Sequence, residues 1–203
     1  MFNIKRHFES WWEYVDPYMI QKLVDNLKKE YDENTVYPSK ENVFRAFRET
    51  PLDTVETIFI GMDPYINEYK GIPSACGLSF VTENGYVNPS LRILCKVLNI
   101  ESQKFKEFVL SKNALMLNTA LTVIKGNTGS HLKLWKDFSE QFIIRLSEHK
   151  NLNWILLGKE AEKLEPLIKS GIILKAPHPM AYQYSGKTEY SELEFIFKEL
   201  KWI

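Results

Sequence analysis

The stretch at residues 55–65 reads VETIFIGMDPY and decides the fold of this chain. Val55 to Ile60 is a short, β-branched run that stops at Gly61, which is typical of a strand. The run lacks a strict alternation of apolar and polar positions, as in a central strand that is covered on both faces. We therefore expect a buried strand here, followed by a loop that begins at the glycine.

Working outward, apolar runs and helical periodicities alternate along the chain. Further strands are predicted at 114–117, 153–157 and 172–174. Helices are predicted at about 17–31, 89–98, 135–146, after Gly158, and at 190–200. Strands that alternate with helices imply parallel strands joined by crossovers. We expect a single domain over residues 1–203, folded as a three-layer α/β/α sandwich around a central, mainly parallel four-stranded sheet.

Composition limits the function classes without selecting one. The 203 residues are 44% hydrophobic and 26% charged, as in an ordinary globular protein. Twenty-six basic and 26 acidic residues cancel, which argues against bulk electrostatic attraction to nucleic acid but allows a locally basic groove. No run of about eighteen uncharged apolar residues is present, and the first residues do not resemble a signal peptide. We expect an intracellular protein without a membrane segment.

The cysteines and acidic residues do not predict a metal or a cofactor. Cys76 and Cys95 lack the spacing of a metal site or a redox pair, so we expect reduced, buried thiols. Nor do the other candidate site residues form a metal-ligand set. The sequence therefore predicts a site that works without metal or cofactor.

Polar residues follow each predicted strand at its carboxyl end. Asp63 and Tyr65 follow the first strand, Asn118 the second, Gly158-Lys159 the third, and His178 the fourth. Ligands in such folds bind beyond the carboxyl ends of the strands. Each residue alone is an ordinary turn, cap or loop residue. Together they offer a carboxylate, an amide and an imidazole on one rim, which favours an enzyme with a small-molecule or nucleotide site.

Six segments in order resemble one known family. Residues 55–65 resemble the strand and water-activating loop of family 1 uracil-DNA glycosylases, whose motif reads GQDPYH. The others are GLSF at 77–80 (family GLAFS), NPSL at 88–91 (the proline-rich loop), LMLNTALTV at 115–123 (family LLLNTVLTV), the strand before the glycine-serine loop at 155–158, and APHPMAY at 176–182 (the HPSPLS loop). The likeness extends from about Val36 to Gly186.

The resemblance implies a pocket for a uracil that has been flipped out of DNA. Asn118 would read N3–H and O4 of the base, and Tyr65 would exclude a methyl group at C5. Phe80 would stack on the ring, and Met62 would contribute its main-chain N–H.

The same resemblance assigns the bond-breaking roles. Asp63 would hold the attacking water and stabilise the cationic sugar, as carboxylates do in glycoside hydrolysis. His178 would donate a hydrogen bond to O2, where negative charge develops.

The segments that would hold DNA differ from the family pattern. Ser90, Gly158, Lys159 and Met180 stand at phosphate-contacting positions, and Tyr182 stands where the family inserts a leucine into the base stack. Met62, Ile66, Lys159, Met180 and Ala181 replace the usual glutamine, histidine, serine, serine and proline. We therefore expect a divergent member with an intact base pocket and altered phosphate contacts.

The expected partner is DNA that contains uracil, with a proteinaceous glycosylase inhibitor or replication proteins as further candidates for a monomeric protein. Two alternatives stay open. One is a glycosylase for another modified base on the same fold, which the intact Tyr65 and Asn118 argue against. The other is a non-catalytic DNA-binding or replication-associated module, which Asp63 and His178 argue against and the altered loops favour.

Overall fold

The computed structural model describes residues 4–186 and 189–203 and has a parallel sheet at its centre. The four strands are β2 (Thr57–Gly61), β5 (Ala114–Asn118), β7 (Asn153–Leu157) and β8 (Ile172–Ala176). Their order in the sheet is β5-β2-β7-β8, and every neighbouring pair is parallel. All five residues of β2 and of β5 are buried, in keeping with their apolar runs. The predicted strands and fold class are confirmed.

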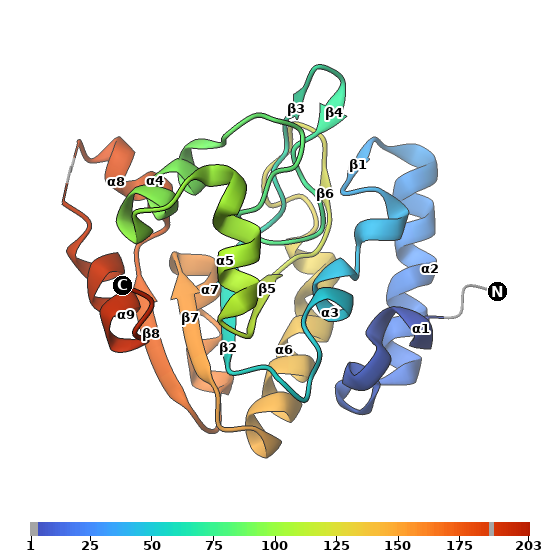
Figure 1. Ribbon diagram of the computed structural model, residues 1–203. Coiled ribbons are helices and arrows are strands. Elements are labelled where there is room, and N and C mark those ends of the chain that lie inside the picture. Colours follow the sequence, from blue (N-terminus) through green and yellow to red (C-terminus); the bar gives the residue numbers. More distant parts are fainter. Residues whose placement is uncertain (1–3, 187–188) are drawn as a thin grey trace.

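Helices connect the strands and cover both faces of the sheet (Figure 1). The connections are α4 (Pro89–Leu98) and α5 (Phe105–Ser111) after β2, α6 (Leu132–His149) after β5, α7 (Lys159–Glu162) after β7, and α8 (Pro179–Tyr184) with α9 (Ser191–Glu199) after β8. The stretch after Gly158 forms only the short α7 and a 3-10 turn at Glu165–Leu167, because Pro166 interrupts the helical pattern.

The N-terminal part adds α1 (Lys5–Phe8), α2 (Pro17–Glu33) and α3 (Arg45–Glu49), with 3-10 turns at Glu9–Tyr14 and Lys40–Asn42. Asp16 caps α2, since its side chain accepts hydrogen bonds from the amides of Tyr18 and Met19 at 2.9 Å each. Helix α2 packs against α6. The segment thereby completes the cover of the sheet.

Two small paired elements have no counterpart in the sequence pattern. Strands β3 (Glu68–Tyr69) and β4 (Ile72–Pro73) form a hairpin that projects at the top of Figure 1. Strand β1 (Val36–Tyr37) pairs with β6 (Val123–Ile124). Strands of two residues are too short to produce a readable alternation, so the sequence gives no signal for them.

The strand order places a topological switch point at β2. The chain leaves β2 toward β5 on one side and returns to β7 on the other side. Crevices at such points, beyond the carboxyl ends of the strands, are where ligands bind in open α/β sheets. The residues after Gly61 lie at this point.

Cys76 and Cys95 are free and buried, and burial raises the pKa of both thiols to about 11. A thiol with so high a pKa is a weak nucleophile at neutral pH. Within residues 4–186 and 189–203, no helix is both long and apolar enough to cross a membrane.

Candidate active site

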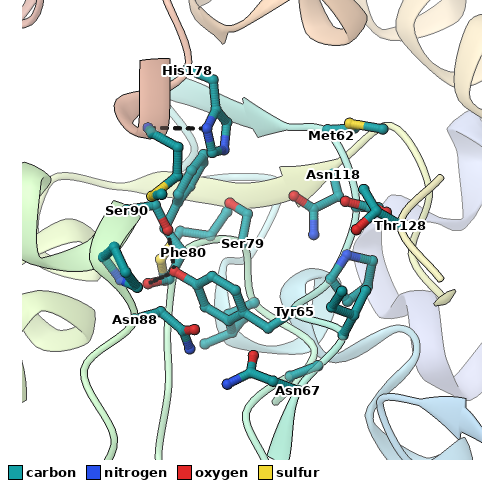
Figure 2. A pocket seen from close by; sticks show the side chains of 18 of the residues that line it. Met62, Tyr65, Asn67, Ser79, Phe80, Asn88, Ser90, Asn118, Thr128 and His178 are labelled. Carbon is teal, nitrogen blue, oxygen red and sulfur yellow. Dashed lines mark hydrogen bonds between the residues drawn. The ribbon is translucent and has the colours of Figure 1, made fainter. Parts of the chain in front are cut away.

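A cavity of about 450 Å³ opens at the carboxyl ends of the sheet (Figure 2). Asp63 and Tyr65 from the loop after β2, Asn118 from the end of β5, and His178 from the start of α8 all line it. The convergence expected from successive strand ends is therefore present. Met62, Phe80, Ser90 and Met180 also line the cavity, together with Asn67, Asn88, Thr128 and Tyr184.

Asn118 depends on a glycine beside it. Strands β2 and β5 bring Gly61 opposite Asn118. A Cβ on Gly61 would lie 2.5 Å from the amide oxygen of Asn118 and 3.0 Å from the ring of Phe80. Glycine thus makes the space in which the amide turns into the cavity, as Figure 2 shows.

Asp63 is a partly buried carboxylate with one oxygen held in place. Its Oδ2 accepts a hydrogen bond of 2.6 Å from the amide of Gly129, in a turn that follows β6. Burial raises the pKa of Asp63 above its ordinary value, and this backbone donor opposes the rise. The fixed Oδ2 leaves the other oxygen of the carboxylate as an acceptor for a water molecule.

The turn at residues 127–131, which contains Gly129, is tied to the protein interior by His131. The indole of Trp135 donates to Thr122 Oγ1 at 2.7 Å, and Thr122 Oγ1 lies 2.8 Å from His131 Nδ1. His131 Nε2 lies 3.3 Å from a carboxylate oxygen of Glu30 on α2. When the hydroxyl of Thr122 donates to Nδ1 and the ring proton resides on Nε2, each donor in this series of hydrogen bonds has an acceptor. No role for His131 was predicted, because its partner Glu30 lies 101 residues away in the sequence.

His178 is held as a neutral hydrogen-bond donor. Its Nδ1 accepts the amide proton of Met180 at 3.2 Å, so the single proton of the neutral ring resides on Nε2. Burial lowers the pKa of His178, which keeps the ring neutral. Gly158 permits this position, because a Cβ there would lie 2.8 Å from the Cβ of His178.

Tyr65 and Phe80 form the aromatic walls. The hydroxyl of Tyr65 donates to the carbonyl of Phe80 at 3.3 Å and lies 2.8 Å from Ser90 Oγ. Phe80 adopts the left-handed backbone region, with φ of 61°, and its ring centroid lies 5.7 Å from that of His178. A buried phenylalanine in this conformation marks a strained position of the kind found at functional sites.

Asn88 stands at the N-cap position of α4, but its side chain makes no capping hydrogen bond. The residue is 6% exposed, and its Nδ2 has no hydrogen-bond partner in the described part of the chain. Figure 2 shows this amide at the lower edge of the cavity, near Asn67. A buried donor without a partner is rare, and this one belongs to a residue that lines the cavity.

Comparison with known proteins decides the family. No family model matches the chain. The uracil-DNA glycosylase of Halalkalibacterium halodurans is 34% identical over 92% of this chain and 88% of its own length. That of Chlamydia pneumoniae is 36% identical over 93% of this chain and 84% of its own. The chain belongs to the uracil-DNA glycosylase family.

Solved structures of uracil-DNA glycosylases show the same fold. The mimivirus enzyme superposes with a TM-score of 0.76 at 24% identity, over 86% of this chain and 68% of that one. The enzyme of Nitratifractor salsuginis gives 0.68 at 15% identity, over 98% and 90%. Uracil-DNA glycosylases are N-glycosyl hydrolases of DNA repair, so the recognition from sequence motifs and the expected enzyme class are confirmed at the level of the family.

The residues that this glycosylase was expected to use against DNA lie in different surroundings. Ser90 is buried and its hydroxyl is engaged by Tyr65. Gly158 packs against His178, and Lys159 is exposed at the start of α7, away from the residues that line the cavity. Met180 lines the cavity.

Tyr182 is not placed to enter a base stack, which corrects the assignment made from the sequence. Its side chain is 2% exposed, its ring packs edge-on against Tyr190, and its hydroxyl donates to Glu192 at 3.0 Å. Helix α8 packs against α4, and Tyr182 contacts Tyr190 and Glu192 at the start of α9. Tyr184, two residues later, is 81% exposed and lines the cavity.

Proposed function

We propose that this chain extrudes uracil from DNA into the cavity and hydrolyses its N-glycosidic bond, leaving an abasic site. The observation that carries the proposal is the set of groups on one cavity: a carboxylate with one fixed oxygen, a neutral imidazole N–H, and an amide that can read a base edge. One glycosylase domain over residues 1–203 would contain all of them.

Recognition of uracil rests on Asn118. Its amide can accept from N3–H and donate to O4, whereas cytosine has the opposite donor and acceptor at these atoms. The wrong base would leave buried polar groups without partners, which is the strongest basis for discrimination. The ring of Tyr65 would close the space beside C5, Phe80 would stack on the base, and Met62 would offer its main-chain N–H.

Bond cleavage requires the enzyme to stabilise two opposite charges, one on the sugar and one on the base. As the bond from C1′ to N1 breaks, the sugar becomes cationic and uracil becomes an anion. Asp63 would stabilise the sugar cation and hold the water whose oxygen bonds to C1′. The Nε2–H of His178 would donate to O2 of the leaving uracil, where a preorganised donor stabilises the developing charge.

Access to the base requires a side chain that fills the vacated stack. We assign this role to Tyr184, which is exposed at the cavity, rather than to the buried Tyr182. An aromatic wedge of this kind compensates part of the unstacking free energy, which is a few kcal/mol.

Phosphate contacts would come from main-chain groups and from few side chains. Ser90 can offer its backbone amide and Lys159 an exposed charge, whereas the amide of Gly158 already donates to the carbonyl of Ala176 at 2.9 Å. The amide of Asn88 is a further donor at the cavity wall. Met180 is apolar and would contribute contact area only.

The decisive experiment uses an oligonucleotide with a single uracil, followed by alkali, which cleaves abasic sites. Wild type should produce strand cleavage. Asp63→Asn should lower the rate at least about a hundredfold, as expected for loss of a catalytic carboxylate. Asp53→Asn, an exposed carboxylate before β2, should leave the rate unchanged and serves as the matched control. No cleavage by wild type would refute the proposal.

The same assay addresses the two alternatives. A glycosylase for another modified base would cleave an oligonucleotide that carries that base and leave uracil intact. A non-catalytic DNA-binding or replication-associated module would bind DNA and release no base. The presence of Tyr65 and Asn118 in the cavity argues against the first alternative, and the held carboxylate of Asp63 with the neutral His178 on the same cavity argues against the second.

DNA containing uracil is the proposed partner, in an intracellular protein that acts as a monomer without a cofactor. Variants of the mimivirus enzyme have been solved in complex with UGI. This supports, by similarity of fold, an inhibitor of that kind as a second partner. Replication proteins remain a proposal from the sequence.

A further inference from the structure

The β3–β4 hairpin and the loop before α4 form one wall at the edge of the cavity. We define this rim wall as residues 67–74 and 82–88. Asn67, at the start of the hairpin, and Ala75, just after its end, line the cavity. Phe80, two residues before the loop, and Asn88, at its end, line it as well. Both segments therefore rise from the cavity edge, and the hairpin projects beyond the rest of the chain in Figure 1.

Hydrogen bonds make the rim wall a single unit. Asn84 Nδ2 donates to the carbonyl of Ile72 at 2.9 Å and to Ser74 Oγ at 3.0 Å, which joins the loop to the hairpin. The amide of Ser74 donates to the carbonyl of Asn67 at 3.0 Å and closes the base of the hairpin. The amide of Tyr86 donates to Asn84 Oδ1 at 3.1 Å. A surface fixed in this way can bind without a large ordering penalty.

The outer part of the rim wall presents aromatic rings and one cation. Tyr69 and Tyr86 stack with ring centroids 5.7 Å apart, and Lys70 Nζ lies 5.2 Å from the centre of the Tyr69 ring. Tyr69 is 37% exposed and Ile72 is 56% exposed. The combination of aromatic faces with an ammonium group is the composition that binds a nucleic-acid strand.

The charge of Lys70 is not neutralised by its neighbours. Glu68, on the same hairpin, pairs with Lys125 at 2.8 Å and accepts from the hydroxyl of Tyr37 at 2.6 Å. Glu83, on the loop, pairs with Arg45 and Lys106. Lys70 takes part in no ion pair among the residues that the structure describes. Within this described part of the chain, Lys70 is therefore an unpaired cation of the hairpin, whose one acidic side chain is already paired with Lys125, at an edge of the cavity where Ile66 and Met180 supply no charge.

We propose that the rim wall binds the DNA strand that continues from the extruded nucleotide, with Lys70 on a backbone phosphate and the Tyr69–Tyr86 stack against the adjoining sugar or base. This rests on the proposed function, because the cavity determines where the DNA lies. The rim wall would thus supply a DNA contact that Ser90 does not, because the hydroxyl of Ser90 is hydrogen-bonded to Tyr65.

The test is the salt dependence of binding for wild type, Lys70→Gln and Lys70→Arg, measured with an oligonucleotide that extends well beyond the uracil on both sides. Lys70→Gln should weaken binding severalfold and reduce the slope of log K against log salt by about 0.7 to 0.9, the loss of one phosphate contact. Lys70→Arg should restore both. Lys169→Gln is the matched control, since Lys169 is exposed before β8, at the opposite end of the strands.

Substrate length gives an independent readout. On a minimal substrate with one nucleotide on each side of the uridine, Lys70→Gln and wild type should have equal kcat/KM. On the long substrate Lys70→Gln should have a raised KM with unchanged kcat. An unchanged slope, or an equal loss on both substrates, would overturn the rim wall proposal. Binding to a uracil-free oligonucleotide tests the slope even if wild type excises no uracil, so the two proposals fail separately.

Discussion

At Asp63 and His178, burial has opposite effects on two groups of one cavity. It raises the pKa of the carboxyl group and lowers that of the imidazole. Asp63 must be ionised to act, so kcat/KM should fall about tenfold per pH unit below its raised pKa. This acid limb should begin at a higher pH than for an ordinary aspartate, because the raised pKa protonates the group earlier as pH falls. The lowered pKa of His178 favours its neutral form as pH falls.

The measurement is kcat/KM from about pH 4 to about pH 8, for wild type and Asp63→Asn. The residual activity of Asp63→Asn should lack the acid limb, since no titrating carboxylate is left at this position. Among the described residues that line the cavity, the other titratable groups are Tyr65, Tyr184 and His178. An acid limb that persists in Asp63→Asn would assign it to His178 and contradict the expectation.

In the proposed mechanism, Asn118 selects the base. Asn118→Asp replaces the amide N–H₂, which donates to O4 of uracil, with a second acceptor. Activity on uracil should fall by about a hundredfold or more, because a polar atom is left facing an acceptor. Activity on cytosine should rise relative to uracil, since its N4 amino group is a donor. Rates on two oligonucleotides that differ only in this base provide the test, and an unchanged ratio would remove Asn118 from its role.

At the scale of elements, the 127–131 turn links α2 to the active site. His131→Phe keeps the ring volume but removes the hydrogen bonds to Thr122 and Glu30. Leaving the buried hydroxyl of Thr122 without its imidazole partner should lower the free energy of unfolding by about 1–3 kcal/mol. If the turn then releases the Gly129 amide from Asp63, the carboxylate loses a stabilising donor. Its acid limb should move to higher pH, which a purely structural loss would not cause.

Glu30→Gln is the matched variant for this turn, because it retains an acceptor for His131 Nε2. Its acid limb should stay close to that of wild type. Thermal unfolding and the pH profile of kcat/KM are measured for both variants. A destabilised His131→Phe with an unmoved acid limb would show that the turn supports the fold without positioning Asp63.

The two tyrosines of α8 differ in exposure, since Tyr182 is buried and Tyr184 is exposed. Tyr182→Ala removes a buried aromatic ring and should lower the free energy of unfolding by about 3–5 kcal/mol. Tyr184→Ala removes an exposed side chain, so the melting temperature should stay within error of wild type. Activity of Tyr184→Ala should fall more on duplex than on single-stranded DNA, because only the duplex has a stack to refill. Equal losses on both substrates would contradict a wedge at Tyr184.

At the scale of the whole molecule, the sequence predicts what depends on local pattern. The run ending at Gly61 and the cap at Asp16 are readable from neighbouring residues, and both agree with the structure. The gathering of Asp63 and Asn118 follows from parallel strands, whose carboxyl ends meet at one edge. The direction of Tyr182 depends instead on where a helix of six residues begins and what it packs against. No local pattern contains that information.

The same distinction explains the contacts that sequence reasoning missed. His131 and Glu30 are 101 residues apart in the sequence. Asn84, on the loop before α4, donates a hydrogen bond to Ile72 on the β3–β4 hairpin. Such pairs join segments whose own composition carries no signal of the contact. An unpartnered amide such as Asn88 Nδ2 is visible only when every donor in three dimensions has been matched with an acceptor.

The balance of charge makes a prediction about the whole enzyme. Because 26 basic residues are offset by 26 acidic ones, long-range attraction to DNA is weak and binding depends on a few local contacts. The slope of log K against log salt should therefore correspond to about two or three phosphates, with a value near −2. Binding to uracil-free duplex DNA over a range of salt concentrations measures it. A slope equivalent to six or more phosphates would mean that an extended basic surface meets the DNA, and the dependence on a few contacts would then be wrong.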